Sequence, residues 1–230
     1  MTVKPLLNLL LALGLIGGMA KADMLIDRSI IEFTPGQPPR HDVIVTNTAL
    51  TPLFVETSVI AVSDPGTPHE RRERLRTPET AGLVASPQRL MIPPQGRRRV
   101  RLVNLEGHGD MERVYRVNLT PHASPMPAAQ GLTLRVQVGY QLLVLIAPTT
   151  ARVELESQRH GQRLLLVNHG NTNLQLSEAR QCAPHSPQHC ERLPNRRLYP
   201  GNRLELPLPF DSAVEFTLVG GGQHASRRVD

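Results

Sequence analysis

The sequence predicts an all-β protein made of two consecutive β-sandwich domains. Short segments in which apolar and polar residues alternate recur along the whole chain, as half-buried strands require. Clusters of Gly, Pro and Asn separate these segments and indicate turns. No window shows the 3.6-residue apolar period of an amphipathic helix. Together these observations favour sandwiches over helical or α/β architectures.

The first 22 residues are predicted to be a secretory signal peptide. Lys4 supplies the positive start, Leu6 to Ile16 form an apolar core, and Ala20-Lys21-Ala22 carries the small residues of a cleavage site. The apolar core is too short to span a bilayer and no second run follows, so we expect export without membrane insertion. The remaining 208 residues allow two β-domains of about 100 residues each.

The exported part of the chain is only mildly basic. The sequence has 26 Lys and Arg residues and 20 acidic residues, and its two Lys, Lys4 and Lys21, lie in the signal peptide. The 24 Arg that remain leave a formal charge of +4. So small a charge on an exported protein argues against nucleic acid as a partner.

The predicted first domain covers residues 23–148. The mixed-charge stretch Asp64 to Ala81 is predicted to be a solvated loop. The arginines of Arg97 to Asn104 stand beside Val100 and Leu102, which favours an exposed sheet face over a phosphate-binding tract. Strands are predicted at 24–33, 40–48, 53–62, 83–92, 97–104 and 112–120, followed by a loop rich in Pro and Ala at 121–130.

The stretch Gly131 to Pro148 is predicted to be one unusually long strand. Every even position from Leu132 to Ile146 is apolar, so one strand face is apolar throughout. At about 3.3 Å per residue the stretch would extend more than 50 Å, several times a typical strand. Such a strand overhangs its sheet and needs a cover, for which another polypeptide is the candidate. An ordinary core strand that runs on into a linker is the alternative.

The predicted second domain covers residues 149–230 and begins after Pro148. Turns are indicated at His169-Gly170-Asn171 and Pro200-Gly201-Asn202. The segment from Gly220 to Asp230 is predicted to be a disordered tail. Strands are predicted at 152–156, 163–168, 173–179, 203–208 and 213–219.

Cys182 and Cys190 lie together in the stretch CAPHSPQHC. In an exported protein the default for such a pair is a disulfide that closes a short loop. The alternative is a zinc site in which His185 and His189 complete four ligands. That ligand spacing is more compressed than in zinc fingers, so the disulfide is favoured and we expect no metal or other cofactor.

No catalytic motif is evident in the sequence. It contains no G-x-S-x-G, H-E-x-x-H or P-loop pattern. Glu154 and Glu156 share a predicted strand face, which is typical of solvated acids and not of a glycosidase pair flanking a cleft. We therefore expect a non-enzymatic protein. An exported β-sandwich module that binds carbohydrate or another surface ligand is one alternative, but the chain has no Trp and only 3% aromatic residues.

Several blocks resemble the periplasmic pilus chaperones of the chaperone/usher pathway. In the first domain they are the opening LIDRSIIEF, the block GLVASPQRL with IPPQGR and VRL, and ERVYRV. In the second domain they are LLVNHGN, the paired-Cys loop and LYPG. The resemblance rests on the order and spacing of these blocks, spans nearly all of the exported chain and is closest to the alternate branch, which serves colonisation-factor fimbriae.

The resemblance implies a periplasmic chaperone of two immunoglobulin-like domains set at an angle. Its partners would be pilin subunits and an outer-membrane usher. A pilin lacks the last strand of its fold, and the chaperone lends its long strand to the open groove until the next pilin replaces it. The same edge could pair two copies of the chaperone. The donor residues implied are Leu132, Leu134, Val136 and Val138, whereas Leu142, Val144 and Ile146 would belong to the chaperone's own core.

The expected carboxylate anchor departs from the family pattern. Family members hold the C-terminal carboxylate of the pilin with an Arg in the first strand and a Lys in the donor strand. This chain has Ile30 at the first position and no Lys between Gln141 and Leu145. A carboxylate buried in a cleft needs a charge-assisted partner. The candidates are Arg116, Arg101 in what we expect to be the neighbouring strand, and Arg28.

A second departure concerns the contact between the domains. Glu112 resembles the acidic residue with which the family links its two domains. Its expected Arg partner, just before Pro148, is Ala147 in this chain. The sequence therefore predicts that this salt bridge is missing or rewired.

Overall fold

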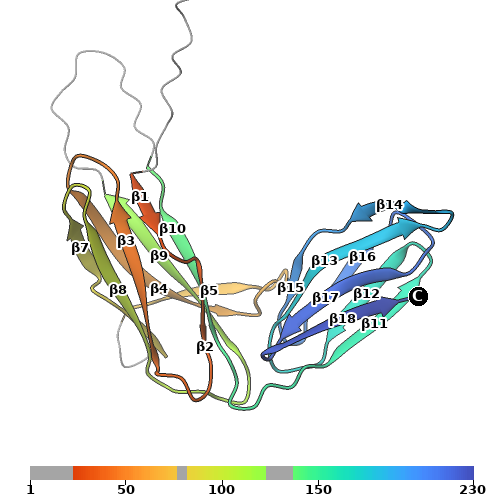
Figure 1. The fold of residues 1–230 in the computed structure, drawn as a ribbon. Helices are drawn as coiled ribbons and strands as arrows, with labels where there is room; N and C mark the ends of the chain where they lie inside the picture. The colour runs from red at the N-terminus through yellow and green to blue at the C-terminus, as the bar shows by residue number, and fades with distance from the viewer. Residues whose placement is uncertain (1–22, 77–81, 123–136) are drawn as a thin grey trace, which may run out of the picture.

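The computed structural model describes residues 23–76, 82–122 and 137–230, and these ranges contain strands and no helix. Two β-sandwiches form the arms of a V (Figure 1), which confirms the predicted fold class. The N-terminal arm contains β1 (Met24–Ile26), β2 (Ile30–Phe33), β3 (Arg40–Asn47), β4 (Leu53–Ser63), β5 (Arg71–Leu75), β6 (Leu83–Ser86), β7 (Arg89–Ile92), β8 (Arg97–Asn104), β9 (Arg113–His122) and β10 (Tyr140–Ile146). The C-terminal arm contains β11 (Leu155–His160), β12 (Arg163–Asn168), β13 (Leu174–Ala183), β14 (Ser186–Arg192), β15 (Arg196–Leu198), β16 (Arg203–Pro207), β17 (Val214–Gly220) and β18 (Gln223–Val229).

Two sheets pack face to face in the N-terminal arm. One has the strand order β1-β3-β8-β6, and the other has the order β2-β10-β9-β4-β5 with β7 added to β4. Alternate side chains of each strand enter the core, as Val43 and Val45 of β3 and Val100 and Leu102 of β8 do. The pair of β2 and β10 is parallel, whereas the other described pairs of this arm are antiparallel.

Two stretches predicted as single strands are each divided between the two sheets. The stretch 24–33 forms β1, which pairs with β3, and β2, which pairs with β10 in the opposite sheet. The stretch 83–92 forms β6 and β7 on either side of the Ser86-Pro87 bond. A strand that changes sheets keeps its alternating sequence, so composition alone does not reveal the break. Pro87 marks the second break because its nitrogen cannot donate to a ladder.

The predicted solvated loop at 64–81 is wrong in part, because Arg71 to Leu75 form β5 and pair with β4. The side chains of β5 are almost all exposed. An edge strand of this kind lacks the apolar alternation on which the sequence prediction depended.

Two sheets also form the C-terminal arm, with the orders β11-β12-β16 and β14-β13-β17-β18, and β15 pairs with β13. Leu164, Leu166, Leu174, Val214 and Phe216 are among the buried residues of its core. The strand predicted at 152–156 lies at 155–160 instead. The backbone of Arg152 and Glu154 bonds to the turn at 169–171 and not to a neighbouring strand.

The predicted disordered tail is wrong. Residues 223–229 form β18, which pairs with β17 over its whole length. Gly221 and Gly222 have φ values of 55° and 75°, and they make the tight turn between the two strands. The side chains of β18 are mostly exposed and polar, so its sequence resembled a solvated tail.

The paired-Cys stretch is a hairpin and not only a loop. Cys182 of β13 lies opposite Cys190 of β14, and the two are joined by a disulfide, as predicted. No group of three or more potential metal ligands occurs among the described residues, so the zinc alternative has no support there.

The arms meet at a small apolar cluster near the base of the V. Tyr199 of the C-terminal arm is buried against Val62, Val114, Leu143 and Leu145 of the N-terminal arm. The hairpin of β4 and β5 reaches across the gap towards β15 (Figure 1). Its turn contacts the same region, because Asn202 Nδ2 donates to the carbonyl oxygen of Pro65 at 2.8 Å.

Candidate functional site

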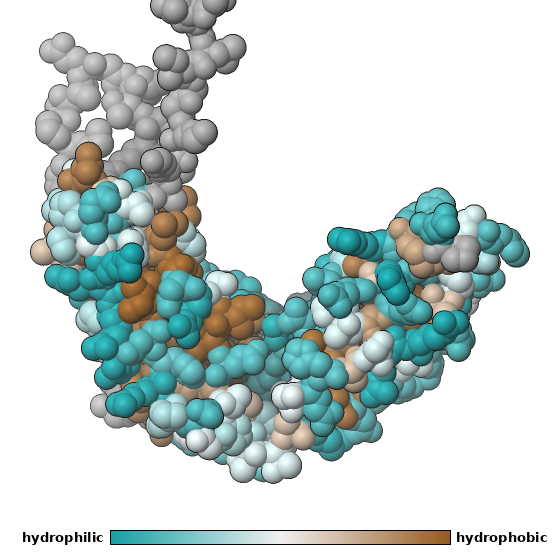
Figure 2. Space-filling view, in the orientation of Figure 1, coloured by the Kyte–Doolittle hydropathy of each residue, from teal (hydrophilic) through white to brown (hydrophobic). Residues whose placement is uncertain are grey.

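The sheet of the N-terminal arm that contains β2, β10, β9, β4 and β5 turns one face towards the C-terminal arm. Ile30 of β2, Leu143 of β10, Arg116 of β9 and Ile60 of β4 lie side by side across it, because each is the direct partner of the next. Ile30 is 47% exposed. Apolar surface is gathered on the N-terminal arm beside the gap (Figure 2). This face combines apolar side chains, some of them exposed, with Arg116 near its centre.

Arg116 is half-buried in the middle of that face. Its Nε is buried and has no hydrogen-bond partner within the described structure, and no ion pair forms between Arg116 and a described carboxylate. The side chain lies close enough to Tyr199 to affect its ionisation. Burial raises the pKa of Tyr199 and the charge of Arg116 acts in the opposite direction. An incoming carboxylate would complete the hydrogen bonds of this guanidinium.

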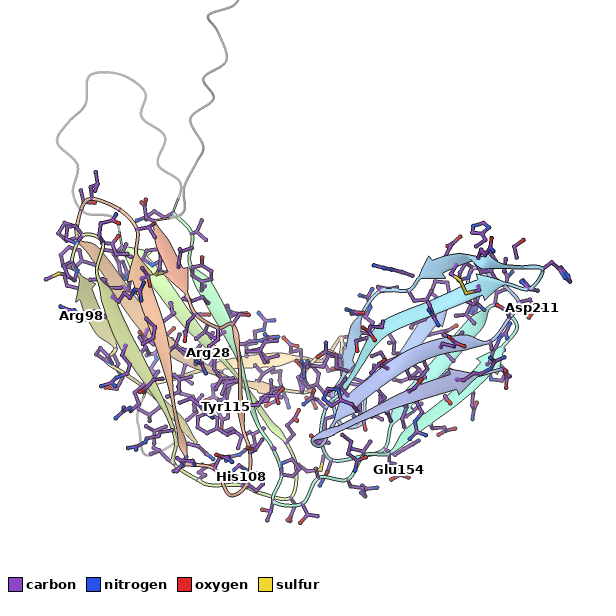
Figure 3. All side chains as sticks on the ribbon, viewed as in Figure 1. Arg28, Arg98, His108, Tyr115, Glu154 and Asp211 are labelled. Carbon is purple, nitrogen blue, oxygen red and sulfur yellow. A yellow bond between two sulfur atoms is a disulfide. The ribbon has the colours of Figure 1, made fainter. Side chains whose placement is uncertain are left out.

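The other two candidate anchors lie elsewhere. Arg101 was expected next to the strand of Arg116, but β8 pairs with β3 and β6 in the opposite sheet, so that expectation was wrong. Its guanidinium makes a bidentate pair with Asp42 at 2.8 and 3.0 Å. Arg28 lies between β1 and β2 near the gap (Figure 3) and pairs with Asp27 at 3.1 Å. Arg116 thus differs from both in having no ion pair within the described residues, although its charge contributes to lowering the pKa of Glu70.

The apolar side chains of β10 are buried, and three of them were predicted to belong to the core. Leu142, Val144 and Ile146 are fully buried in the core of the N-terminal arm, which confirms that part of the prediction. The predicted donor residues Leu132, Leu134 and Val136 lie outside the described residues. Val138 is described and is 43% exposed. It lies two residues before β10, which begins at Tyr140.

One edge of β10 is open at its N-terminal half. The pair of β2 and β10 includes only Leu143 to Ile146, whereas β9 accompanies β10 from Tyr140 onward. Within the described ranges, Tyr140, Gln141 and Leu142 therefore have a strand on one side only. An edge with free backbone groups is where an additional strand can pair.

Glu112 links the two arms, as its position suggested. One carboxylate oxygen accepts hydrogen bonds from Thr172 Oγ1 at 3.0 Å, from the backbone nitrogen of Asn173 at 3.0 Å and from Asn173 Nδ2 at 2.6 Å. The other oxygen is buried without a partner. Burial raises the pKa of Glu112, although these bonds and the charge of Arg197 oppose the shift. The missing salt bridge is thus replaced by hydrogen bonds.

In the part of the chain that the structure describes, no helix has the length and apolarity needed to cross a membrane.

Several solved structures have a fold similar to that of this chain. The chain superposes on the class 5 fimbriae chaperone CfaA with a TM-score of 0.65 and 20% sequence identity. The match covers 90% of this chain and 99% of CfaA. The chain has the fold of the fimbrial chaperones. The chaperone–tip subunit complex CsuC–CsuE from archaic Csu pili of Acinetobacter baumannii matches with a TM-score of 0.60 and 14% identity, over 90% of this chain and 98% of that chain.

A third similar structure is the complex of the SafA pilin with the SafB chaperone of Salmonella enterica. It matches with a TM-score of 0.62 and 14% identity, over 91% of this chain and 97% of that chain. No protein family model matches this chain, and no curated protein matches it. The fimbrial-chaperone fold is therefore recognised from the two-arm architecture and not from sequence identity.

Proposed function

We propose that this protein is a periplasmic chaperone of fimbria assembly, which binds a pilin subunit and delivers it to an outer-membrane usher. The observation that carries the proposal is the open edge of β10 next to an apolar sheet face. The alternating segment 132–138 leads directly into that edge. A pilin that lacks one strand could pair with this segment and with the free backbone of Tyr140 to Leu142.

The side chains that would enter the pilin groove are Leu132, Leu134, Val136 and Val138. In an extended strand they would share one face, because they lie two residues apart in the sequence. Main-chain hydrogen bonds would supply affinity that does not depend on sequence, and the four side chains would select a groove of matching shape. Burial of one such side chain contributes roughly 1.5–3 kcal/mol. The intervening Thr133, Arg135 and Gln137 would face away from the groove.

Arg116 would hold the C-terminal carboxylate of the bound pilin. It is the one candidate anchor among the three that has no carboxylate partner in the described structure. Two parallel N–H donors of a guanidinium fit the two oxygens of a carboxylate. Tyr199 and Leu143 beside it would exclude water and strengthen that contact.

This function requires binding and release but no catalytic step, and we propose a non-enzymatic protein without a cofactor. The carbohydrate-binding module is the weaker alternative, because the similar structures described above are chaperones. An apolar face around one arginine also suits a peptide better than a sugar.

The experiment that tests the proposal is recovery of the tagged protein from the periplasm of its native host, with mass spectrometry of the proteins that accompany it. We expect a stoichiometric partner of pilin size. A bound glycan with no protein partner would instead favour the surface-binding module.

A further inference from the structure

A cavity of about 600 Å³ lies at the edge of the N-terminal arm, away from Arg116 and Glu112. It forms where β4 changes its neighbour. Residues 53–56 of β4 pair with β7, and residues 59–63 pair with β5, so Thr57 and Ser58 fall in the interval between the two ladders. β4 runs from one neighbour to the other across the arm (Figure 1). The volume of the cavity falls within the range of small-molecule sites.

The inner wall of the cavity is apolar apart from one hydroxyl group. Val59 and Leu75 line it from one sheet, and Leu83 and Ala85 line it from the other. Thr57 lies between them and is 4% exposed, and its Oγ1 is buried without a hydrogen-bond partner. A buried hydroxyl usually finds a partner, so an unpaired one at a cavity wall points to a missing hydrogen-bonding group.

The mouth of the cavity is positively charged. Arg74, Arg76 and Arg89 line it together with one acid, Glu56. Glu56 is already engaged, because Arg74 donates to it at 2.7 Å and His122 lies 3.2 Å from it. The bond from Arg74 and the contact with His122 lower the pKa of Glu56, which keeps it ionised.

Arg76 and Arg89 have no acidic partner in the described structure, since each of the ion pairs found there involves other residues. Two guanidinium groups without an ion pair among the described residues therefore stand beside an apolar wall. Guanidinium forks bind carboxylate, sulfonate and phosphate groups, and the wall suits a hydrocarbon or aromatic body.

We propose that this cavity is a binding site for a small anionic amphiphile, a molecule with one acidic group and an apolar body. Arg76 and Arg89 bind the acidic group, the wall formed by Val59, Leu75, Leu83 and Ala85 contacts the apolar body, and Thr57 Oγ1 pairs with a polar atom of that body. Arg116, Leu143 and Ile30 do not line this cavity, and the proposed binding of the amphiphile needs none of them, so it does not depend on the proposed chaperone function.

The test uses two fluorescent probes that differ mainly in charge, 8-anilinonaphthalene-1-sulfonate and the neutral N-phenyl-1-naphthylamine. Titrated into the full exported chain, the sulfonate should bind with at least about tenfold higher affinity, in keeping with charge-assisted hydrogen bonds. Octanoate should displace it, whereas octanol should not. Equal affinity for both probes, or displacement by octanol alone, would contradict the proposal.

Variants locate the site. The double variant Arg76→Gln with Arg89→Gln should weaken sulfonate binding about tenfold or more and leave the neutral probe unaffected. Arg98→Gln is the matched control, because Arg98 is exposed on the outer side of the same arm (Figure 3). Unchanged binding in the double variant, or a loss with Arg116→Ala instead, would place the probe elsewhere and overturn the proposal.

Discussion

At the scale of single residues, the unusual feature is Arg116, a half-buried cation that forms no ion pair with the acids that the structure describes. Removing a charged group from water is unfavourable unless an opposite charge or hydrogen bonds replace the lost solvation. Arg101 meets this requirement through Asp42, and Arg28 through Asp27. Arg116 does not, so a bound carboxylate would gain a partner that is already positioned on the sheet.

Substitution of Arg116 by Ala should weaken the proposed binding of pilin and leave the protein folded. A hydrogen bond to a charged group contributes about 1.5–3 kcal/mol, which corresponds to a loss of affinity of roughly 10- to 150-fold. Arg116→Lys should recover part of the loss because it keeps the charge but not the fork. Titration of purified pilin, refolded in the presence of each variant, measures the effect.

Arg101→Ala is the control for this prediction, because it removes an arginine from the opposite sheet. It should leave pilin binding unchanged. A larger loss with Arg101→Ala than with Arg116→Ala would move the anchor to the other sheet.

Glu112 should make the contact between the arms depend on pH. Burial raises its pKa in the folded protein, so the ionised form is less favourable there than in the unfolded chain. Stability should therefore increase as the pH falls from neutral towards the ordinary pKa of Glu. Its unpartnered oxygen can take up the proton without loss of the bonds from Thr172 and Asn173.

Denaturant unfolding of the wild type and of Glu112→Gln over this pH range measures the effect. The stability of the wild type relative to Glu112→Gln should rise on acidification, because Gln does not titrate. A difference that stays constant, or that falls, would show that the carboxyl group is not destabilised by burial.

The sequence predicted which face of its strand Arg116 occupies. It did not predict the neighbours of Arg101 or the partners of Glu112, because these depend on which strands and turns come together. The alternation in Glu112 to Thr120 placed Arg116 on a polar face, and the structure puts it on the face that looks across the gap. The neighbours of Arg101 were misjudged because sequence order does not state which strands pair. The partners of Glu112 come from a turn 60 residues away, which no local pattern can indicate.

At the scale of elements, apolar alternation predicted the buried strands well. The stretches 40–48, 97–104 and 163–168 agree closely with β3, β8 and β12. β5 and β18 were missed for a shared physical reason. Both lie at the edge of a sheet and expose most of their side chains, so they carry no apolar period and are held mainly by main-chain hydrogen bonds.

The disulfide across the hairpin of β13 and β14 should stabilise the C-terminal arm. It closes a short loop, because its cysteines are 8 residues apart in sequence. Loop-closure entropy predicts about 2–3 kcal/mol for such a bond. The double variant Cys182→Ser with Cys190→Ser should therefore unfold at a lower temperature than the oxidised wild type.

Thermal unfolding with and without reductant measures this contribution. Reductant should lower the midpoint of the wild type and leave that of the double variant unchanged. Stoichiometric zinc in the unmutated protein, detected by elemental analysis, would contradict the disulfide assignment.

At the scale of the whole molecule, the relation of the two arms rests on few contacts. Tyr199 is the buried aromatic residue of the cluster between them. Truncation of this side chain should lower the free energy of unfolding by about 3 kcal/mol, as for other buried aromatic side chains. It should also let the angle between the two arms vary more widely. Tyr199→Ala should lower the unfolding midpoint and broaden the distance distribution in small-angle scattering.

Tyr199→Phe is the matched control, because it keeps the ring that packs on Leu143 and Leu145. It should behave like the wild type in both measurements. If Tyr199→Ala leaves the scattering profile unchanged, the arms are held by the hydrogen bonds of Glu112, Asn171 and Asn202 instead.

The central claim is that one face of the segment 132–138 enters a groove of the pilin. The most direct measurement compares Val136→Arg with Gln137→Arg, by recovery of pilin from the periplasm with each tagged variant. Val136→Arg should abolish recovery because it would bury an unpaired charge, whereas Gln137→Arg should recover pilin at the wild-type level, since its side chain faces away. Equal recovery with both variants would contradict donation of this strand.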